Sequence, residues 1–442
     1  MFLNFGRLEI SVQTANINGQ DLYKWLKDLF PINRSLTGKG VRETLEYLKS
    51  IIPNLEIREV KSGTKAFDWV VPKEWNLEEA YLIDENHKTI IHSKNSNLHV
   101  VGYSPPIDRE ISRVELESHL YSIPELPKAI PYVTSYYEEN WGFCMSHEDR
   151  VKLTSGPFRA VIKSSLEPGV LNYGELCVPG SSKNEILLST YICHPSMASN
   201  ELSGPVIAAG LALWLESLEN RKYTFRILFL PETIGSIVYL SENLKYLKNH
   251  VKAGWVLTCL GDNRNISFLP SKKGDTLADK VSRKVLKDLK QDWIEYSFLE
   301  RGSDERQYCA PGVELPVCSI MRSKYGTYPE YHTSLDNLEF VSESSLHESY
   351  NLMKNTLQAV ENDYLWVNKN YCEPNLGKRG LYPMISTRET NNKVKDLMNV
   401  LTYCDGSLST VDIAEKCLLE FKDCLEILLL LEKEDLISRI SY

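Results

Sequence analysis

The chain has 442 residues, too many for one ordinary hydrophobic core, so we expect two or three domains. Its hydrophobic content of 43% and charged content of 25% are typical of a soluble globular protein. The net charge of −9 argues against nucleic acid as the main partner, because neutralising phosphates requires an excess of Lys and Arg over some face.

Two features of the sequence predict a cytoplasmic protein without a membrane partner. No run is long and apolar enough to cross a membrane, and residues 1–10 lack the apolar core and cleavage site of a signal peptide. The ten cysteines include no CxxC pair, and several lie inside apolar runs. We therefore expect reduced, buried thiols and neither a disulfide framework nor a thiolate zinc site.

The first third of the chain changes from a helical to a β pattern. Residues 21–30 and 40–52 have apolar residues at helical spacing and predict an opening pair of helices. From 61 to 167, short alternating runs separated by turn signals predict an inserted all-β domain, of a size for a small β-sandwich. Its aromatic segment at 132–143 is either a ligand wall or, as we favour, core and domain-interface packing.

Strand and helix patterns alternate from Gly174 onward. Strands are expected at 174–179, 185–193, 223–230, 253–260 and 313–320, and helices at 206–218, 237–247, 276–289 and 342–363. This series predicts an α/β fold, with a mostly parallel sheet sandwiched by helices. The opening helices precede the β domain, so residues 1–60 and 168–365 are expected to form one α/β domain into which residues 61–167 are inserted.

Residues 380–442 have a pattern of their own, with three helices and a terminal hairpin, which predicts a winged-helix domain. Such a domain commonly binds DNA. The segment 411–436, however, contains eight acidic and three basic residues, whereas a recognition helix needs Lys or Arg facing phosphates. We therefore favour a packing role or homo-oligomer formation through this domain over nucleic-acid binding.

Polar residues suited to a hydrolytic metal site stand next to the strands of the predicted sheet. His194, Glu232, Asp262 and His332 follow strands, and the run 301–308, which contains Asp304, Arg306 and Tyr308, precedes the strand at 313–320. Imidazole and carboxylate groups are ligands that zinc prefers, and parallel strands present their carboxyl ends at one edge. For single residues a plainer interpretation stays open: Asp262 could form an Asx-turn, and Glu232 could complement a helix dipole.

The order of these residues resembles that of the zinc-dependent aminopeptidases with a co-catalytic two-metal site, whose clan also contains glutaminyl cyclases. The run Ala198-Ser199-Asn200-Glu201-Leu202-Ser203-Gly204 lies between the first two of them, as in those enzymes. The chain more closely resembles a bacterial aminopeptidase-like family with an inserted β domain and a C-terminal winged helix, often linked with surface-polysaccharide biosynthesis. The runs 33–38 and 193–196 match that family's signature.

The resemblance implies a role for each matching position. His194 and Asp262 would bind one zinc, His332 would bind the other, and Glu232 would be the general base. Asn200 stands where the aminopeptidases have the bridging aspartate, and Thr233 stands where they have a second glutamate ligand. Both differences remove negative charge between two cations, so we expect one zinc per chain, with two only if Glu201 supplies the bridge.

We expect the protein to be a zinc metallohydrolase that cleaves an amide or peptide bond near a free amine. Its partner would be a small-molecule or peptide-like substrate, with Asp304 facing the ammonium group and Arg306 or Tyr308 holding a carboxylate or sugar hydroxyl. The neutral side chains of Asn200 and Thr233 leave a second hypothesis open, in which the protein is a zinc-containing binding or scaffold protein with reduced catalysis.

Overall fold

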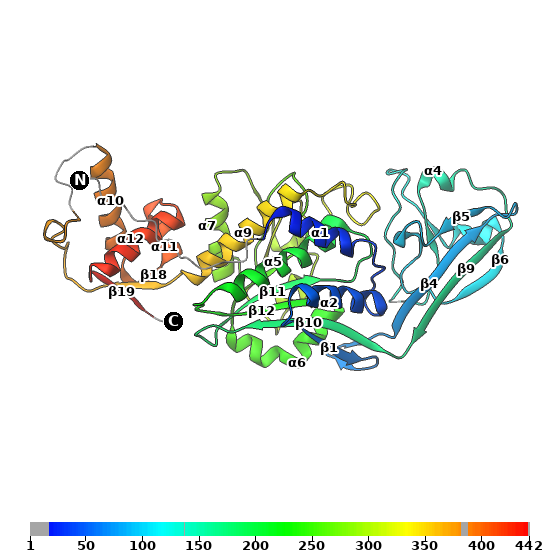
Figure 1. Ribbon diagram of the computed structural model, residues 1–442, viewed down its shortest axis with the longest axis horizontal. Coiled ribbons are helices and arrows are strands. Elements are labelled where there is room, and N and C mark those ends of the chain that lie inside the picture. Colours follow the sequence, from blue (N-terminus) through cyan, green and yellow to red (C-terminus); the bar gives the residue numbers. More distant parts are fainter. Residues whose placement is uncertain (1–16, 137, 382–387, 441–442) are drawn as a thin grey trace. The chain divides into compact units, whose positions relative to one another are not determined.

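The α/β domain is built on an eight-stranded sheet in the computed structural model, which describes residues 17–136, 138–381 and 388–440 (Figure 1). Its strands, in spatial order, are β1 (Glu56–Lys61), β10 (Val170–Val178), β12 (Thr224–Leu230), β11 (Glu185–Tyr191), β13 (Val251–Val256), β16 (Val317–Met321), β14 (Ser267–Leu269) and β15 (Ile294–Glu295). The four strands from β12 to β16 are parallel, whereas β1, β10 and β14 pair in antiparallel fashion. The predicted α/β fold with a mostly parallel sheet is confirmed.

Helices cover both faces of this sheet (Figure 1). Helices α1 (Gly19–Leu29), α2 (Lys39–Ile51) and α5 (Ser203–Ser217) lie on one face, and α6 (Ile234–His250) packs its apolar residues on the other. Helix α5 is apolar on nearly all sides because it is enclosed by α1 and the strands. In the described part of the chain, no helix is both long and apolar enough to cross a membrane.

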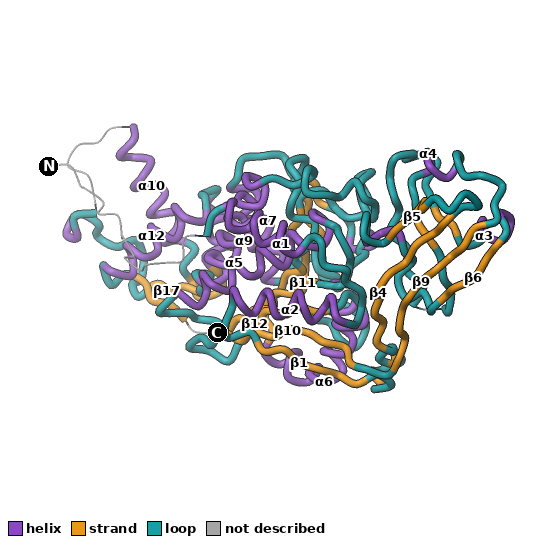
Figure 2. The backbone as a smooth tube through the Cα atoms, turned by 45° about the vertical axis from the view of Figure 1, so that its right-hand side comes forward, coloured by secondary structure: helices purple, strands orange, loops and turns teal. Residues whose placement is uncertain are grey.

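The insertion forms a separate antiparallel sheet with the order β5-β4-β9-β6 (Figure 2). Its strands are β4 (Glu74–Ile83), β5 (Thr89–His92), β6 (Ile107–Ile111) and β9 (Phe158–Glu167). This is one four-stranded sheet and not the expected sandwich of two. The chain between β6 and β9 contributes mainly loops, the short pair β7 (Leu120–Tyr121) and β8 (Phe143–Cys144), and the one-turn helices α3 (Arg113–Glu117) and α4 (His147–Arg150).

The C-terminal domain is the predicted winged helix, with one strand more than expected. It contains β17 (Leu365–Asn368), α10 (Arg388–Thr402), β18 (Asp405–Ser409), α11 (Thr410–Cys417), α12 (Phe421–Lys433) and β19 (Ile437–Ile440). The strand β17 precedes residue 380, the predicted start, and lies between β18 and β19, so the expected terminal hairpin does not form. The fully buried Trp366 anchors β17 in the domain core.

Helix α7 (Leu277–Asp288) groups with the winged helix. Basic residues in this helix and just after it form ion pairs with acidic residues of that domain. Three ion pairs join Lys280 to Asp412, Lys287 to Glu415 and Lys290 to Glu420, at 2.9, 2.9 and 2.5 Å. The buried Lys284 donates to the carbonyl of Leu419 at 2.6 Å, and the Asp288 carboxylate accepts from the backbone N–H of Phe421 at 2.8 Å. The α11–α12 segment therefore packs on a helix of its own chain.

Candidate active site

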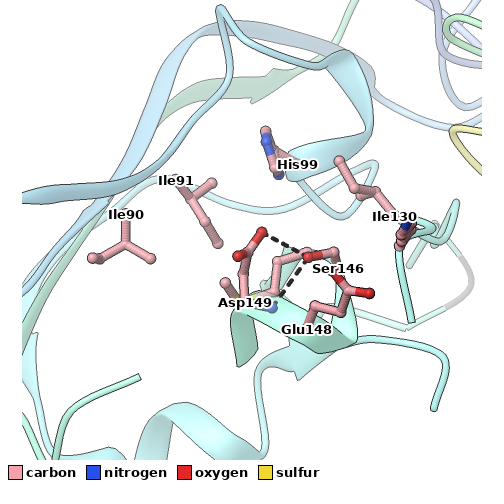
Figure 3. A pocket seen from close by; sticks show the side chains of 9 residues that line it. Ile90, Ile91, His99, Ile130, Ser146, Glu148 and Asp149 are labelled. Carbon is pink, nitrogen blue, oxygen red and sulfur yellow. Dashed lines mark hydrogen bonds between the residues drawn. The ribbon is translucent and has the colours of Figure 1, made fainter. Parts of the chain in front are cut away.

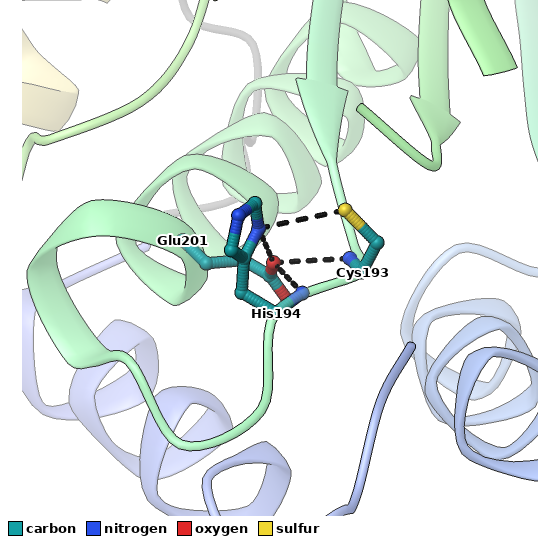
Figure 4. A group of neighbouring side chains, drawn as sticks. All are labelled: Cys193, His194 and Glu201. Carbon is teal, nitrogen blue, oxygen red and sulfur yellow. Dashed lines mark hydrogen bonds and ion pairs between the residues drawn. The ribbon is translucent and has the colours of Figure 1, made fainter. Parts of the chain in front are cut away.

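His194 lies three residues beyond the end of β11 and directly before Pro195. Its imidazole is buried, and Nδ1 is 2.8 Å from Oε2 of Glu201 (Figure 4). The same carboxylate accepts hydrogen bonds from the backbone N–H groups of Cys193 and His194. A carboxylate can only accept, so Nδ1 carries the proton and Nε2 is left as the free ligand atom.

The Glu201 carboxylate is itself fixed by Arg34. The two side chains form a fully buried ion pair, with Nε of Arg34 2.7 Å from Oε1 of Glu201. Arg34 also donates to the backbone carbonyls of His194 and Leu29. Glu201 lies on a short π-helical turn, η2 (Ala198–Leu202). Because its carboxylate is engaged with Nδ1 of His194 and with Arg34, it is not free to bridge two metals.

Glu232 approaches the Nε2 side of the His194 ring, and the ring of His332 packs near the same imidazole. Oε2 of Glu232 is 3.8 Å from Nε2 of His194, and the ring centroids of His194 and His332 are 5.1 Å apart. Burial raises the pKa of Glu232, while His194 and a hydrogen bond from Ser303 oppose the rise. Burial and the neighbouring His194 together lower the pKa of His332 well below its usual value. The structure thus brings a carboxylate and two imidazoles together.

The loop before α8 (Glu305–Tyr308) holds the Glu232 segment in place. Ser303 Oγ donates to Oε1 of Glu232 at 2.8 Å, and Arg306 donates to Thr233 Oγ1 at 3.1 Å. The buried Asp304 accepts from the backbone N–H of Thr233 and from Ser236 Oγ, both at 2.8 Å. Burial and nearby Glu232 raise the pKa of Asp304 to about 7. Oδ1 of Asp304 therefore supports the Thr233 turn, while its buried Oδ2 has no hydrogen-bond partner among the described residues.

Two predicted site residues are engaged in other hydrogen bonds. The Asp262 carboxylate accepts from the backbone N–H of Arg264, which is the Asx-turn left open above, and from Ser323; among the described residues it forms no hydrogen bond with His194 or His332. Tyr308 is fully buried and its hydroxyl bonds to Ser189 Oγ at 2.8 Å, so it cannot reach a ligand.

Asn200 lies at the edge of the site. Its Nδ2 donates to the hydroxyl of Tyr191 at 2.9 Å, and the Tyr191 ring lies 5.3 Å from that of His194. Its Oδ1 is buried and has no hydrogen-bond partner among the described residues. An acceptor left in this state is available to a ligand, which fits the predicted contact with a metal.

Backbone strain marks the loops that surround the site. Ser196, Thr233, Cys259 and His332 are non-glycine residues with φ of 49°, 64°, 53° and 55°. This left-handed conformation costs L-residues energy and persists where the surrounding structure enforces it. Of these four residues, His332 belongs to the group formed by the Glu232 carboxylate and the two imidazoles, and Thr233 directly follows Glu232.

Sequence reasoning missed or underrated three contributors. Tyr132, in the aromatic segment that we assigned to packing, lies with its ring 5.0 Å from His194 and 5.3 Å from His332. Ser303 orients Glu232, and Glu201 orients His194. For Glu201, the available signal was Arg34 in the Asn33–Gly38 signature. Arg34 and Glu201 are 167 positions apart along the chain, so the sequence did not indicate that they pair.

A second set of donors lies on the Nδ1 side of His194. Cys193, His194 and Glu201 are the described residues whose donor atoms lie close enough together to hold an ion (Figure 4). Burial raises the pKa of the Cys193 thiol to about 11, so it is protonated at neutral pH. Glu201 already pairs with Arg34. An ion there would have to break these contacts, whereas Nε2, His332 and Asn200 Oδ1 remain available.

The fold around this site is that of the zinc aminopeptidases. It aligns with BSAP, a zinc aminopeptidase from Bacillus subtilis, at a TM-score of 0.56 over 77% of this chain and 94% of that one, with 10% sequence identity. Residues 23–363 match the family described as "Domain of unknown function (DUF4910)", and the chain belongs to that family. Residues 364–439 match a winged helix-turn-helix family, which confirms the predicted domain type.

A similar sequence and a similar crystal structure, both from Clostridium acetobutylicum, confirm the resemblance inferred from the motifs. One is a "Putative polysaccharide biosynthesis protein with aminopeptidase-like domain", 44% identical over 413 residues, which are 93% of this chain and 94% of that protein. The other is the crystal structure of a "putative peptidase", 42% identical, with a TM-score of 0.90 over 96% of each chain.

Proposed function

We propose that the protein is a zinc-dependent hydrolase that cleaves an amide or peptide bond near a free amine, in surface-polysaccharide metabolism. The observation that carries the proposal is the approach of Glu232 to the free side of His194, beside His332. The description of the Clostridium relative supports the link to polysaccharide, and the fold shared with BSAP supports the reaction class.

We propose that one zinc ion binds beside the Nε2 atom of His194. His194 and His332 supply imidazole, and the unpartnered Oδ1 of Asn200 supplies a third donor. Zinc, when bound, polarises the scissile carbonyl. With Asp262 engaged elsewhere and Thr233 neutral, the site has too little negative charge for two dications. We therefore propose one zinc per chain.

Glu232 is the proposed general base. Its Oε2 faces the site with its side chain 21% exposed, and Ser303 holds the other oxygen. Burial, which raises its pKa toward neutrality, suits a group that takes a proton from the attacking water and returns it to the leaving amine. Arg306, which is exposed beside Thr233, is the proposed partner of a substrate carboxylate or hydroxyl.

The test is metal analysis combined with a panel of aminoacyl-arylamides assayed with zinc or cobalt. The proposal expects bound metal and hydrolysis of at least one arylamide. His194→Ala, purified in parallel, should lose both metal and activity, which controls for contaminating peptidases. Activity of the same size in His194→Ala would contradict the proposal.

A second function is favoured by one specific observation. Asn200 and Thr233 stand where related aminopeptidases are expected to carry carboxylates, so the site resembles one that retains an ion without full catalysis. Stoichiometric metal without turnover of any arylamide would support this zinc-containing binding or scaffold protein over the hydrolase.

A further inference from the structure

A short segment of the inserted β domain, residues 130–134, crosses to the α/β domain; we name it the strap. At one end it belongs to the β domain, because the Gly102 N–H donates to the Val133 carbonyl at 2.9 Å and Gly102 forms a β-bridge with Thr134. The side chain of Ile130 lines a cavity of about 320 Å³ in that domain (Figure 3). The strap is therefore anchored on both sides of Tyr132.

The strap pairs with the loop that carries His332. Ile130 and Ser334 exchange two hydrogen bonds, from Ile130 N–H to Ser334 Oγ and from Ser334 N–H to the Ile130 carbonyl, both 2.9 Å. The Tyr132 N–H donates to the His332 carbonyl at 2.9 Å, and Pro131 forms an antiparallel bridge with Thr333. Two segments about 200 residues apart thus form a small ladder.

Tyr132 then places its ring against both imidazoles. The ring is tilted by 57° to His194 and is edge-on to His332 at 89°. Aromatic rings in such geometries attract one another beyond simple burial. Among the described residues, the Tyr132 hydroxyl and the ring nitrogens of His332 form no hydrogen bond. Ring packing therefore orients His332, with Tyr331 stacked on one face at 3.9 Å and Tyr132 edge-on to it at 5.3 Å. A strained residue with φ of 55° needs this kind of external restraint.

We propose that Tyr132 is a positioning residue for His332, and that the inserted β domain thereby completes the candidate metal site. The backbone ladder fixes the loop, and the aromatic ring fixes the direction of the imidazole. The use of that imidazole for zinc rests on the proposed function, whereas its placement by Tyr132 does not.

The experiment compares full-length Tyr132→Ala and Tyr132→Phe with wild type, using Tyr81→Ala as a matched control. Tyr81 lies in the same domain and packs on a different imidazole, His92, at 5.9 Å. Two quantities are measured: deuterium exchange of residues 330–336 in the metal-free protein, and affinity for cobalt(II) from its visible absorption spectrum.

Tyr132→Ala should exchange faster at 330–336 and bind cobalt about 10–100-fold more weakly, as expected when the support of a ligand is removed. Tyr132→Phe should restore both quantities, because the hydroxyl has no partner, and Tyr81→Ala should match wild type. Wild-type exchange in a folded Tyr132→Ala, or failure of Phe to rescue, would overturn the proposal.

Two outcomes are kept apart by this design. If wild type binds no cobalt, the proposed zinc function fails, but exchange in the metal-free protein still decides the role of Tyr132. If Tyr132→Ala does not fold, Ser334→Ala replaces it, since loss of the acceptor for Ile130 N–H should also speed exchange at 330–336. Unchanged exchange in that variant would contradict the ladder's role.

Discussion

His194 enters the site with one ring nitrogen already committed. Glu201 holds Nδ1, and Arg34 holds Glu201, so the buried chain of charge and hydrogen bonds decides which nitrogen is free. The sequence places His194 at a strand end by its pattern, but nothing in the pattern distinguishes Glu201 behind the ring from Asn200 beside it. That difference depends on one turn of π-helix. Asp336 stabilises this turn, because its two carboxylate oxygens accept hydrogen bonds from the backbone N–H groups of Ser199 and Asn200.

Arg34→Met tests this support. Removal of the guanidinium leaves the fully buried Glu201 without its counter-charge, so we expect a loss of about 3–5 kcal/mol in the free energy of unfolding. Zinc affinity should fall about 10–100-fold. Denaturant titration and metal-buffer competition measure the two effects. A stable variant with wild-type affinity would show that the pair is dispensable.

Glu232→Gln tests the proposed base. The amide retains the shape of the side chain and the contact with Ser303, but it cannot accept a proton, so turnover should fall about 10²–10⁴-fold while zinc content stays unchanged. Steady-state assays on the best arylamide measure the effect. If Glu232 only complemented the nearby helix terminus, stability would change by about 0.3–1 kcal/mol and activity would remain.

At the scale of elements, regular patterns were predictable and short ones were not. The five predicted strands of the α/β domain and its predicted helices overlap the observed ones, whereas the strands β1, β14 and β15 were not predicted. The four-residue strand β17 and the loop-rich chain between β6 and β9 are too short for a period, so their pairing depends on distant partners. Tyr132 was underrated for the same reason, because its neighbours His194 and His332 are distant in sequence.

The junction of α2 with β4 should depend on pH. A hydrogen bond from Arg42, at 2.6 Å, lowers the pKa of Glu74 to about 2 from 4.5. Between these values the unfolded state binds more protons, so the stabilising contribution is complete above about pH 4.5 and is lost as the pH falls through 2. Glu74→Gln should lower the free energy of unfolding at pH 7 by about 1–2 kcal/mol. The expected loss is kept this small because Arg42 is partly exposed to solvent.

Chemical denaturation of wild type and Glu74→Gln at a series of pH values measures this difference. Glu78→Gln on the same strand is the control, since Glu78 forms no ion pair with any described residue. A stability difference for Glu74→Gln that persists undiminished at pH 2 would contradict the assignment.

Helix α7 should support the winged helix mainly through its one buried lysine. Lys284→Met removes a charge-assisted hydrogen bond to the Leu419 carbonyl and should lower the free energy of unfolding by about 1.5–3 kcal/mol. Lys280→Met removes only an exposed pair with Asp412 and should cost about 0.2–1 kcal/mol. Thermal unfolding of the two variants compares them. Equal losses would show that surface charge, and not the buried contact, joins α7 to α11 and α12.

At the scale of the whole molecule, the candidate site draws on segments from three parts of the sequence. The loop between the opening helices contributes Arg34, the inserted β domain contributes Tyr132, and the rest of the α/β domain contributes His194, Glu232 and His332. The insertion is therefore part of the site and not merely an appended module. The family resemblance predicted the fold and three of these residues, because motif order is retained in the sequence, whereas contacts between domains are not.

We propose that one zinc ion binds on the Nε2 side of His194. Anomalous diffraction at the zinc edge, from crystals of the zinc-loaded protein, tests this most directly. We expect one peak per chain, bordered by His194 Nε2, His332 and Asn200, with the Glu232 carboxylate within about one water of it. A peak among Cys193, His194 Nδ1 and Glu201, or no peak at full zinc occupancy in solution, would contradict it.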